Sequence, residues 1–206
     1  GKFAWVRRLG HSLIKSTEIE IGGARIDKQY GDWLNIWYEL CRDCSHDRGY
    51  AEMIGDVPEM TKLCRETKPE FTTYVPLQFW FNRNTGLALP LIALQYHEVR
   101  VHFEFRKKED LYIRNETATT VGGLKDATLL VEYIYLDSEE RRRFAQVGHE
   151  YLIEQVQFTG EETVNAGAHK YKLNFNHPTK ELIWMLKDYN YTYGKKFWAY
   201  SNTDDW

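Results

Sequence analysis

The sequence contains few of the features that mark a secreted, membrane-spanning or nucleic-acid-binding protein. Three cysteines, an odd number, do not form a disulfide framework, so a reducing compartment is expected. No apolar run approaches the roughly 18 residues that a membrane span requires. A net charge of −3 over 206 residues gives no general electrostatic attraction to nucleic acid. The chain starts at Gly1 without a recognisable secretory signal, so we expect a fragment or a processed product.

Motifs of the common hydrolases and nucleotide-binding enzymes are also missing. The sequence has no Gly-x-Ser-x-Gly elbow and no phosphate-binding glycine-rich loop. His97 and Glu98 begin like a metalloprotease helix, but that motif needs a second His at the position of Val101. No His-x-His pair offers the ligands of a metal-holding jelly roll. We therefore expect no catalytic residues, no cofactor, no metal and no enzymatic activity.

One cluster has the ligand types of a zinc site. Cys41, Cys44 and His46 are closely spaced, and Cys64 follows twenty residues after Cys44. A second close ligand pair is missing, so the favoured interpretation is a helix end with neighbouring thiols. Whether these four residues bind a metal stays open at the level of sequence.

Paired carboxylates offer the other chemical possibility, that of a glycosidase. On a strand, Glu18 and Glu20 share the face opposite Ile19, where charged side chains meet solvent in any case. Glu161 and Glu162 are adjacent and receive the same interpretation. These carboxylates are therefore predicted to be solvated surface groups.

Strand patterns and aromatic side chains dominate what is present. Aromatic residues make up 15 % of the chain, which is ample for a core. Residues 99–106 alternate apolar and polar side chains, as in a sheet with one buried face, whereas residues 128–136 are apolar on both faces and should be covered on both sides. Gly22-Gly23 and Gly122-Gly123 predict turns with positive φ, and the first should form a hairpin. The predicted strands are residues 3–9, 13–21, 24–28, 75–81, 99–106, 128–136, 151–158, 171–175 and 182–186.

Two helical segments interrupt the strands. Asp32 is a suitable N-cap, and the apolar residues that follow at helical spacing predict a buried face. Their tryptophans could instead stack on a sugar or a nucleic acid, but packing is favoured. A helix within residues 50–63 is limited by Gly55 and Pro58. The residues of the first predicted face are Trp33, Ile36, Trp37 and Leu40.

Loops and long connections complete the prediction. Residues 82–86, 107–110, 121–125 and 161–169 are expected to be turns or loops, and the apolar run 87–94 should pack or form an association patch. Many strands with long connections predict an all-β, antiparallel jelly-roll or Greek-key sandwich with short helices in the long loops.

Three blocks of this sequence closely resemble the major capsid proteins of nucleocytoplasmic large DNA viruses. In the order in which that family has them, they are residues 19–40 (IEIGGARIDKQYGDWLNIWYEL), 75–99 (VPLQFWFNRNTGLALPLIALQYHEV) and 172–187 (KLNFNHPTKELIWMLK). The resemblance implies two consecutive jelly rolls, of which this chain would hold the first. Residues 1–187 would be the N-terminal jelly roll without its opening strand or strands, and residues 188–206 a linker and the start of the second roll.

The resemblance also implies a function and a set of partners. Such a protein is structural and needs no cofactor; it self-assembles as homotrimeric, pseudo-hexagonal capsomers into an icosahedral virion shell in the infected host cytoplasm. The implied partners are neighbouring capsomers and minor capsid and penton proteins, with an inner membrane nearby and no direct nucleic acid. Alternatives are a minor or penton capsid protein with a single roll, and a jelly-roll carbohydrate-binding module. A jelly-roll enzyme is opposed by the missing His pairs.

Overall fold

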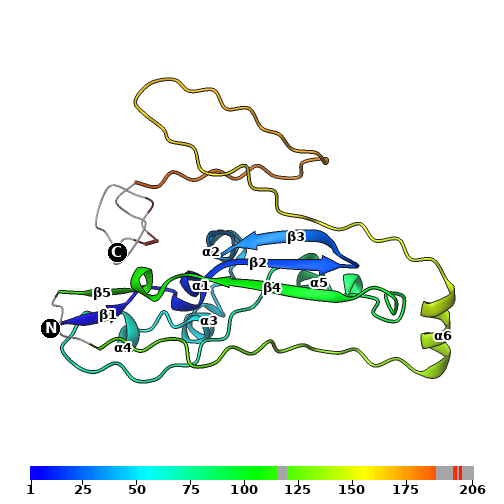
Figure 1. The fold of residues 1–206 in the computed structure, drawn as a ribbon, viewed down its shortest axis with the longest axis horizontal. Helices are drawn as coiled ribbons and strands as arrows, with labels where there is room; N and C mark the ends of the chain where they lie inside the picture. Colours follow the sequence, from blue (N-terminus) through cyan, green and yellow to red (C-terminus); the bar gives the residue numbers. More distant parts are fainter. Residues whose placement is uncertain (116–119, 189–196, 199, 201–206) are drawn as a thin grey trace.

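The computed structural model describes residues 1–115, 120–188, 197–198 and 200 of the chain. Its described strands form two antiparallel sheets, with the orders β3-β2-β4 and β1-β5 (Figure 1). Short helices surround them, so antiparallel pairing and short helices are both confirmed, and the described part is more helical than predicted. The elements are β1 (Phe3–Trp5), α1 (Leu9–Leu13), β2 (Ile14–Ile21), β3 (Ala24–Tyr30), α2 (Gly31–Cys41), α3 (Asp47–Ile54), α4 (Pro58–Thr61), α5 (Trp80–Arg83), η1 (Thr85–Leu87), β4 (Val99–Phe105), η2 (Lys108–Leu111), β5 (Tyr112–Arg114) and α6 (Ser138–Gln146).

The predicted hairpin is confirmed. β2 and β3 pair antiparallel, and Gly22 and Gly23 join them with φ values of 60° and 82°, which glycine adopts at little cost. β4 pairs antiparallel with the other edge of β2, with Ile19 opposite Val101. The positive φ predicted for Gly122 and Gly123 is wrong, because neither residue is among the glycines with positive φ.

The first predicted helix is confirmed as α2, but its buried face differs from the prediction. The helix begins at Gly31 after the N-cap Tyr30, and it buries Leu34 and Asn35. Leu40, predicted to be buried, is 62 % exposed. The buried residues Gly31, Leu34 and Asn35 are three or four positions apart and so lie on one side of the helix. That side approaches the body closely, since a Cβ added at Gly31 would lie 2.2 Å from the Ile14 carbonyl oxygen.

The first predicted strand and the second predicted helix are each divided into shorter elements. The strand expected over residues 3–9 ends at Trp5, because Arg8 takes a left-handed conformation (φ 50°) and α1 follows. The helix expected within residues 50–63 is two helices, α3 and α4, divided at Gly55 (φ 76°) and Pro58 as their chemistry suggests. The loop expected at residues 107–110 is largely the 3₁₀ helix η2.

The strand predicted over residues 75–81 is wrong. This segment is irregular until α5, and its apolar side chains pack against the sheet instead of joining it. The Asn82 side chain accepts the Phe79 backbone N–H (3.3 Å) and turns the chain into α5. Phe79 is fully buried and packs with Ile19 and Trp80 in the core cluster beneath the sheet, so it contributes to the core without being part of a strand.

Four further predicted strands, residues 128–136, 151–158, 171–175 and 182–186, are also wrong as strands. Residues 120–137 run in extended form along the body to α6, and residues 150–187 form a long loop beside the β3-β2-β4 sheet (Figure 1). Within the described residues no neighbouring strand pairs with them, and a strand needs a partner for its ladder. The two-sided cover predicted for residues 128–136 is likewise wrong, since Leu130 is 75 % and Tyr135 is 91 % exposed.

The C-terminal part packs against the N-terminal part where it is described. Phe197 and Trp198 are buried with Val6 and Leu111, and the Trp198 indole N–H is 2.8 Å from the Arg7 carbonyl oxygen. Most of residues 188–206, predicted as a linker and the start of a second roll, lies outside the described residues, so that division stays a prediction. Among the described residues, no helix is both long and apolar enough to cross a membrane.

Candidate assembly surfaces

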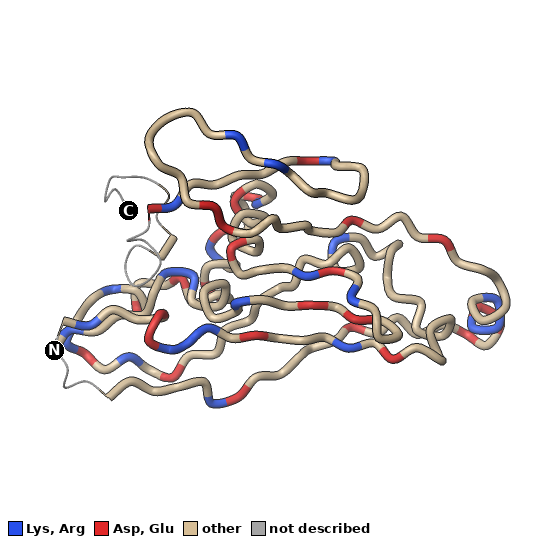
Figure 2. The backbone as a smooth tube through the Cα atoms, turned by 45° about the horizontal axis from the view of Figure 1, so that its top comes forward, with Lys and Arg blue, Asp and Glu red and all other residues tan. Residues whose placement is uncertain are grey.

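The solvent face of the β3-β2-β4 sheet carries side chains of opposite charge that form ion pairs. Glu18 lies 3.8 Å from both Arg25 and Lys28, and Glu20 lies 3.5 Å from Arg100 and 3.1 Å from His102. Figure 2 shows the two signs interspersed over the body. Glu18 and Glu20 therefore lie on the solvent face, as the alternation of the sequence predicted. They form surface ion pairs, each of which contributes little to stability.

The inner face of the same sheet carries a buried polar cluster that the sequence pattern did not indicate. Asp27 and Gln29 on β3 and Thr17 on β2 are almost fully buried. The Gln29 side-chain amide donates to Asp27 (3.0 Å) and to the Gln78 carbonyl oxygen (2.7 Å). Burial raises the pKa of the Asp27 carboxyl, and hydrogen bonds from Val156 and Gln29 oppose that rise. The cluster links the sheet to two irregular segments.

Residues 153–158 dock onto β3 through this cluster. The Val156 backbone N–H donates to Asp27 (2.9 Å), and the Gln155 amide donates to the Ile26 carbonyl oxygen. The rings of Phe158 and Tyr30 lie 5.0 Å apart. This docking fixes the start of the long loop of residues 150–187 against the sheet edge.

A cavity of about 150 Å³ lies between α1, α2 and α3. Its charges are matched within the chain: Arg7 and Arg8 pair with Asp56 (3.1 and 3.7 Å), and Arg42 pairs with Asp47 (3.6 Å). A free anion would have to compete with these carboxylates. We interpret the cavity as a structural ion-pair network that joins three helices.

His11 lies beside this network and is fully buried. Its Nε2 is 2.8 Å from the Tyr50 hydroxyl, and its Nδ1 has no hydrogen-bond partner among the described residues. Burial, assisted by the Arg8 charge, lowers the pKa of His11 to about 3. Tyr50 stacks on Tyr38 at 4.1 Å, and burial raises the pKa of each hydroxyl to about 12. His11 is thus neutral at physiological pH.

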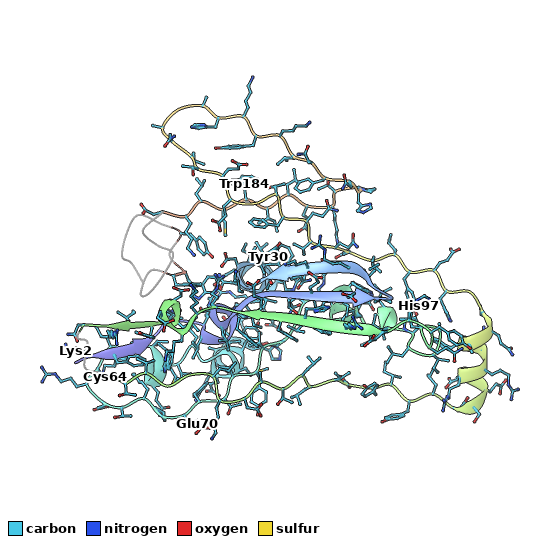
Figure 3. All side chains as sticks on the ribbon, in the orientation of Figure 1. Lys2, Tyr30, Cys64, Glu70, His97 and Trp184 are labelled. Atoms are coloured by element: carbon cyan, nitrogen blue, oxygen red, sulfur yellow. The ribbon has the colours of Figure 1, made fainter. Side chains whose placement is uncertain are left out.

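The residues considered as metal ligands do not converge in the described part of the structure. Cys41 and Cys44 are exposed free thiols at the end of α2, and Cys64 is a half-buried free thiol whose backbone bridges to Phe3. Figure 3 places Cys64 near Lys2, at the opposite end of the long axis from His97. No group of three or more His, Cys, Asp or Glu side chains in the described residues is arranged to hold a metal ion.

The two predicted packing segments behave differently. Trp33 and Trp37 are half-buried with ring centroids 5.8 Å apart, and the Arg83 guanidinium lies 4.6 Å from the Trp37 ring centroid. In the run 87–94, Leu87 and Leu89 pack against the core cluster, whereas Leu91 is 44 % exposed. Both segments contribute to packing, and both leave apolar surface in contact with solvent.

Exposed apolar side chains are concentrated in residues 120–188. Trp184 projects from the long loop and is 83 % exposed (Figure 3). Most of these side chains lie on two segments, residues 120–137 and 150–187, on opposite sides of the body in Figure 1, and exposed apolar surface of this kind favours association with other polypeptide. The side chains that are half or more exposed in this stretch are Leu124, Leu130, Val131, Tyr133, Ile134, Tyr135, Val147, Leu152, Phe158, Val164, Leu173, Leu182, Trp184 and Leu186.

The structure also reveals a contact that the sequence patterns did not indicate. Trp198 donates to the Ser12 hydroxyl (2.9 Å) and closes the N-terminal core from a distance of 186 residues. Its sequence signal is the adjacent pair of aromatic residues, Phe197-Trp198, in a C-terminal stretch that is rich in tyrosine. Such a pair gives no indication of where it packs.

Antiparallel sheets with a charge-matched outer face lie next to long apolar segments that pair with no strand in the described part of the chain. Comparison with known proteins identifies the class. Residues 1–137 match the family model "Major capsid protein N-terminus", and residues 140–204 match the model "Large eukaryotic DNA virus major capsid protein". The chain belongs to the major capsid protein family of large eukaryotic DNA viruses.

Curated relatives and solved structures agree with this assignment. The chain is 53 % identical to capsid protein 1 of Acanthamoeba polyphaga mimivirus over 97 % of its length, and 55 % identical to the major capsid protein of Pyramimonas orientalis virus over 86 %. It spans only 36 % and 43 % of those two relatives. The chain is also similar to a chain in a quasi-atomic model of the PBCV-1 virus capsid, with a TM-score of 0.62 and 34 % identity. The match covers 87 % of this chain and 44 % of the capsid chain.

Proposed function

We propose that this chain is the N-terminal part of a structural protein that self-assembles into the shell of a large DNA virus. The observation that carries the proposal is the family match, which spans residues 1–137 and 140–204. The exposed apolar stretch of residues 120–188 supports it, because that surface needs cover from further polypeptide. The protein acts by association and not by catalysis, and it resides in the virion capsid.

The finer architecture belongs to the same proposal. Residues 1–187 form most of a first jelly roll, and residues 188–206 lead toward a second. The complete protein forms homotrimeric, pseudo-hexagonal capsomers, which contact one another and minor capsid and penton proteins over an inner membrane. Assembly takes place in the host cytoplasm. None of Cys41, Cys44, His46 and Cys64 is assigned a metal in this proposal.

Electron microscopy of the full-length gene product tests the function. We expect hexagonal capsomers, or shells built from them, from the purified protein without added metal or cofactor. Light scattering on the same sample should give three times the mass of the full-length chain. A full-length product that stays monomeric and forms no capsomer-like particles contradicts the proposal.

A further inference from the structure

The outer edge of β4 carries unused backbone hydrogen-bonding groups. The Glu98 carbonyl accepts the Gly22 N–H, and the Arg106 N–H donates to the Leu13 carbonyl (both 2.9 Å). The backbone N–H and C=O groups of the even-numbered β4 residues therefore point toward β2. Those of the odd-numbered residues point outward, away from β2. Within residues 1–115, 120–188 and the other described positions, no backbone hydrogen bond involves these outward groups, which belong to Val99, Val101, Phe103 and Phe105.

The same four residues form an apolar face that is only partly covered. Val99 and Val101 pack against the core cluster of Ile19, whereas Phe103 and Phe105 continue the face beyond that cover and are 36 % and 40 % exposed. The two phenyl rings stack at 6.2 Å. A strand that adds to this edge must therefore present apolar side chains at alternate positions.

The sequence of β4 is complementary to itself when read antiparallel about its centre. Residues 99–105 read Val-Arg-Val-His-Phe-Glu-Phe, with His102 in the middle. Placing a second copy antiparallel brings Arg100 opposite Glu104 twice, on the charged face. On the apolar face it brings each valine opposite a phenylalanine, a favourable cross-strand pair.

The direction of the free backbone groups agrees with this register. In a pair centred on His102, odd-numbered residues oppose odd-numbered residues, and these are the residues with outward N–H and C=O groups. Each outward group of the four residues then meets a partner in the other copy. The Arg100 and Glu104 side chains are each 53 % exposed, so both can reach across while they keep Glu20 and Lys15 as neighbours.

We propose that the β4 edge is a self-association surface, on which a second copy of this chain adds its own β4 antiparallel, with the two His102 residues at the twofold axis. The two three-stranded sheets become one continuous sheet, and Phe103 and Phe105 become cross-strand neighbours of Val101 and Val99 of the second copy. The inference rests on the proposed self-assembly and names one contact that supports it. The two can fail separately, because capsomer formation by the full-length product does not require this pairing.

A charge exchange tests the register. Arg100→Glu or Glu104→Arg alone places like charges opposite each other at two positions, and each should raise the dimer dissociation constant about tenfold or more in sedimentation equilibrium. The double variant Arg100→Glu/Glu104→Arg restores opposite charges and should recover dimerisation. Arg48→Glu, on exposed α3, is the matched control and should leave dimerisation unchanged. Equal association of all variants, or a parent chain that stays monomeric at every concentration, overturns the proposal.

Disulfide trapping is the second test and does not depend on affinity. In a chain whose three cysteines are changed to Ser, His102→Cys places two thiols at a non-hydrogen-bonded pair, where Cα atoms lie about 4.5 Å apart. Mild oxidation should then give a covalent dimer, whereas Arg100→Cys, out of register with its own copy, should not. Equal yields from the two variants, or none from His102→Cys, overturn the proposal. Hydrogen-exchange protection of the outward amides of Val101 and Phe103 in a monomeric full-length product would also overturn it, because the rest of the polypeptide would then occupy the edge.

Discussion

Gly31 determines how α2 sits on the rest of the protein. An added Cβ would lie 2.2 Å from the Ile14 carbonyl oxygen and 2.6 Å from the His11 carbonyl oxygen, which are backbone atoms that cannot rotate away. The apolar spacing of the helix predicted burial of Leu40, which is 62 % exposed, whereas Gly31, Leu34 and Asn35 are buried. We infer that the close backbone approach at Gly31 favours burial of the side of the helix that carries it.

Gly31→Ala should destabilise the protein by about 2–3 kcal/mol, because α2 must move away from α1 and β2 to accept the methyl group. Chemical denaturation with circular dichroism measures this change. Gly49→Ala is the matched control, since Gly49 lies in α3 with open space around it. It should leave stability unchanged or raise it by about 0.5–1 kcal/mol. Equal effects of the two variants would contradict the packing explanation.

His11 should make stability depend on pH. The pKa of His11 is about 3 in the folded chain and 6.5 at its ordinary value, so the unfolded chain binds the extra proton between these limits. The free energy of unfolding should therefore not depend on His11 above pH 6.5. It should fall as pH drops from 6.5 toward 3, and this residue should contribute at most about 1.4 kcal/mol per pH unit to that fall. His11→Gln removes the titration, so its stability profile should lose that part of the slope. An unchanged slope would show that His11 is not the cause.

At the scale of elements, α6 is a helix that depends on its own cap. It has no buried residue, and Asp137 accepts the backbone N–H groups of Glu139 (2.9 Å) and Glu140 (2.8 Å). Glu140 accepts the Asp137 N–H in return (3.2 Å), which completes a capping box. Local capping is therefore expected to decide whether this helix forms, since Phe144 is its one partly buried side chain among the described residues.

Asp137→Ala should destabilise α6 by about 1 kcal/mol and leave the melting temperature of the whole chain unchanged. Hydrogen exchange should show the amides of α6 opening about fivefold more often. Asp137→Asn keeps a capping oxygen and should behave almost like the parent chain. A lower global melting temperature in the alanine variant would instead place α6 within the cooperative core.

The elements that sequence patterns predicted correctly have a local turn signal or a strand partner within the described residues. The β2–β3 hairpin follows from Gly22-Gly23 between alternating segments, and β4 follows from its own alternation. The segments 128–136 and 182–186 have equally strong strand patterns, yet no described strand pairs with them. Apolar alternation reports that a segment suits a sheet, but it does not supply the neighbouring strand.

At the scale of the whole molecule, we propose that the two half-buried tryptophans of α2 pack between jelly rolls or between subunits. We expect Trp37→Glu to prevent trimerisation of the full-length product, because it replaces the ring that packs with Trp33 by a carboxylate, and burying a carboxylate in an apolar contact is costly. Light scattering measures the mass. Met53→Glu, a half-exposed position on α3, is the control and should stay trimeric. A trimeric Trp37→Glu protein would contradict the role of this surface.

The candidate surfaces were predictable only in part. The solvent face with Glu18 and Glu20 follows from alternation, and the four possible metal ligands can be named from spacing alone. Their separation could not be foreseen, because Cys64 joins Phe3 through a backbone bridge between segments distant in sequence. The buried Asp27 and Gln29 also escaped prediction, since a polar residue on a strand is expected to face water.

The sequence by itself determined the family, the β2–β3 hairpin and the existence of α2, because each rests on residues that are neighbours along the chain, and it marked β4 by alternation although the partner of that strand, β2, is distant in sequence. Tertiary structure alone decided which face of α2 is buried, that residues 75–79 pack beneath the sheet as an irregular segment before α5, and that Trp198 closes the N-terminal core. These outcomes depend on contacts between distant segments. Such contacts are set by the shape of the space that remains to be filled, and no local pattern encodes that shape.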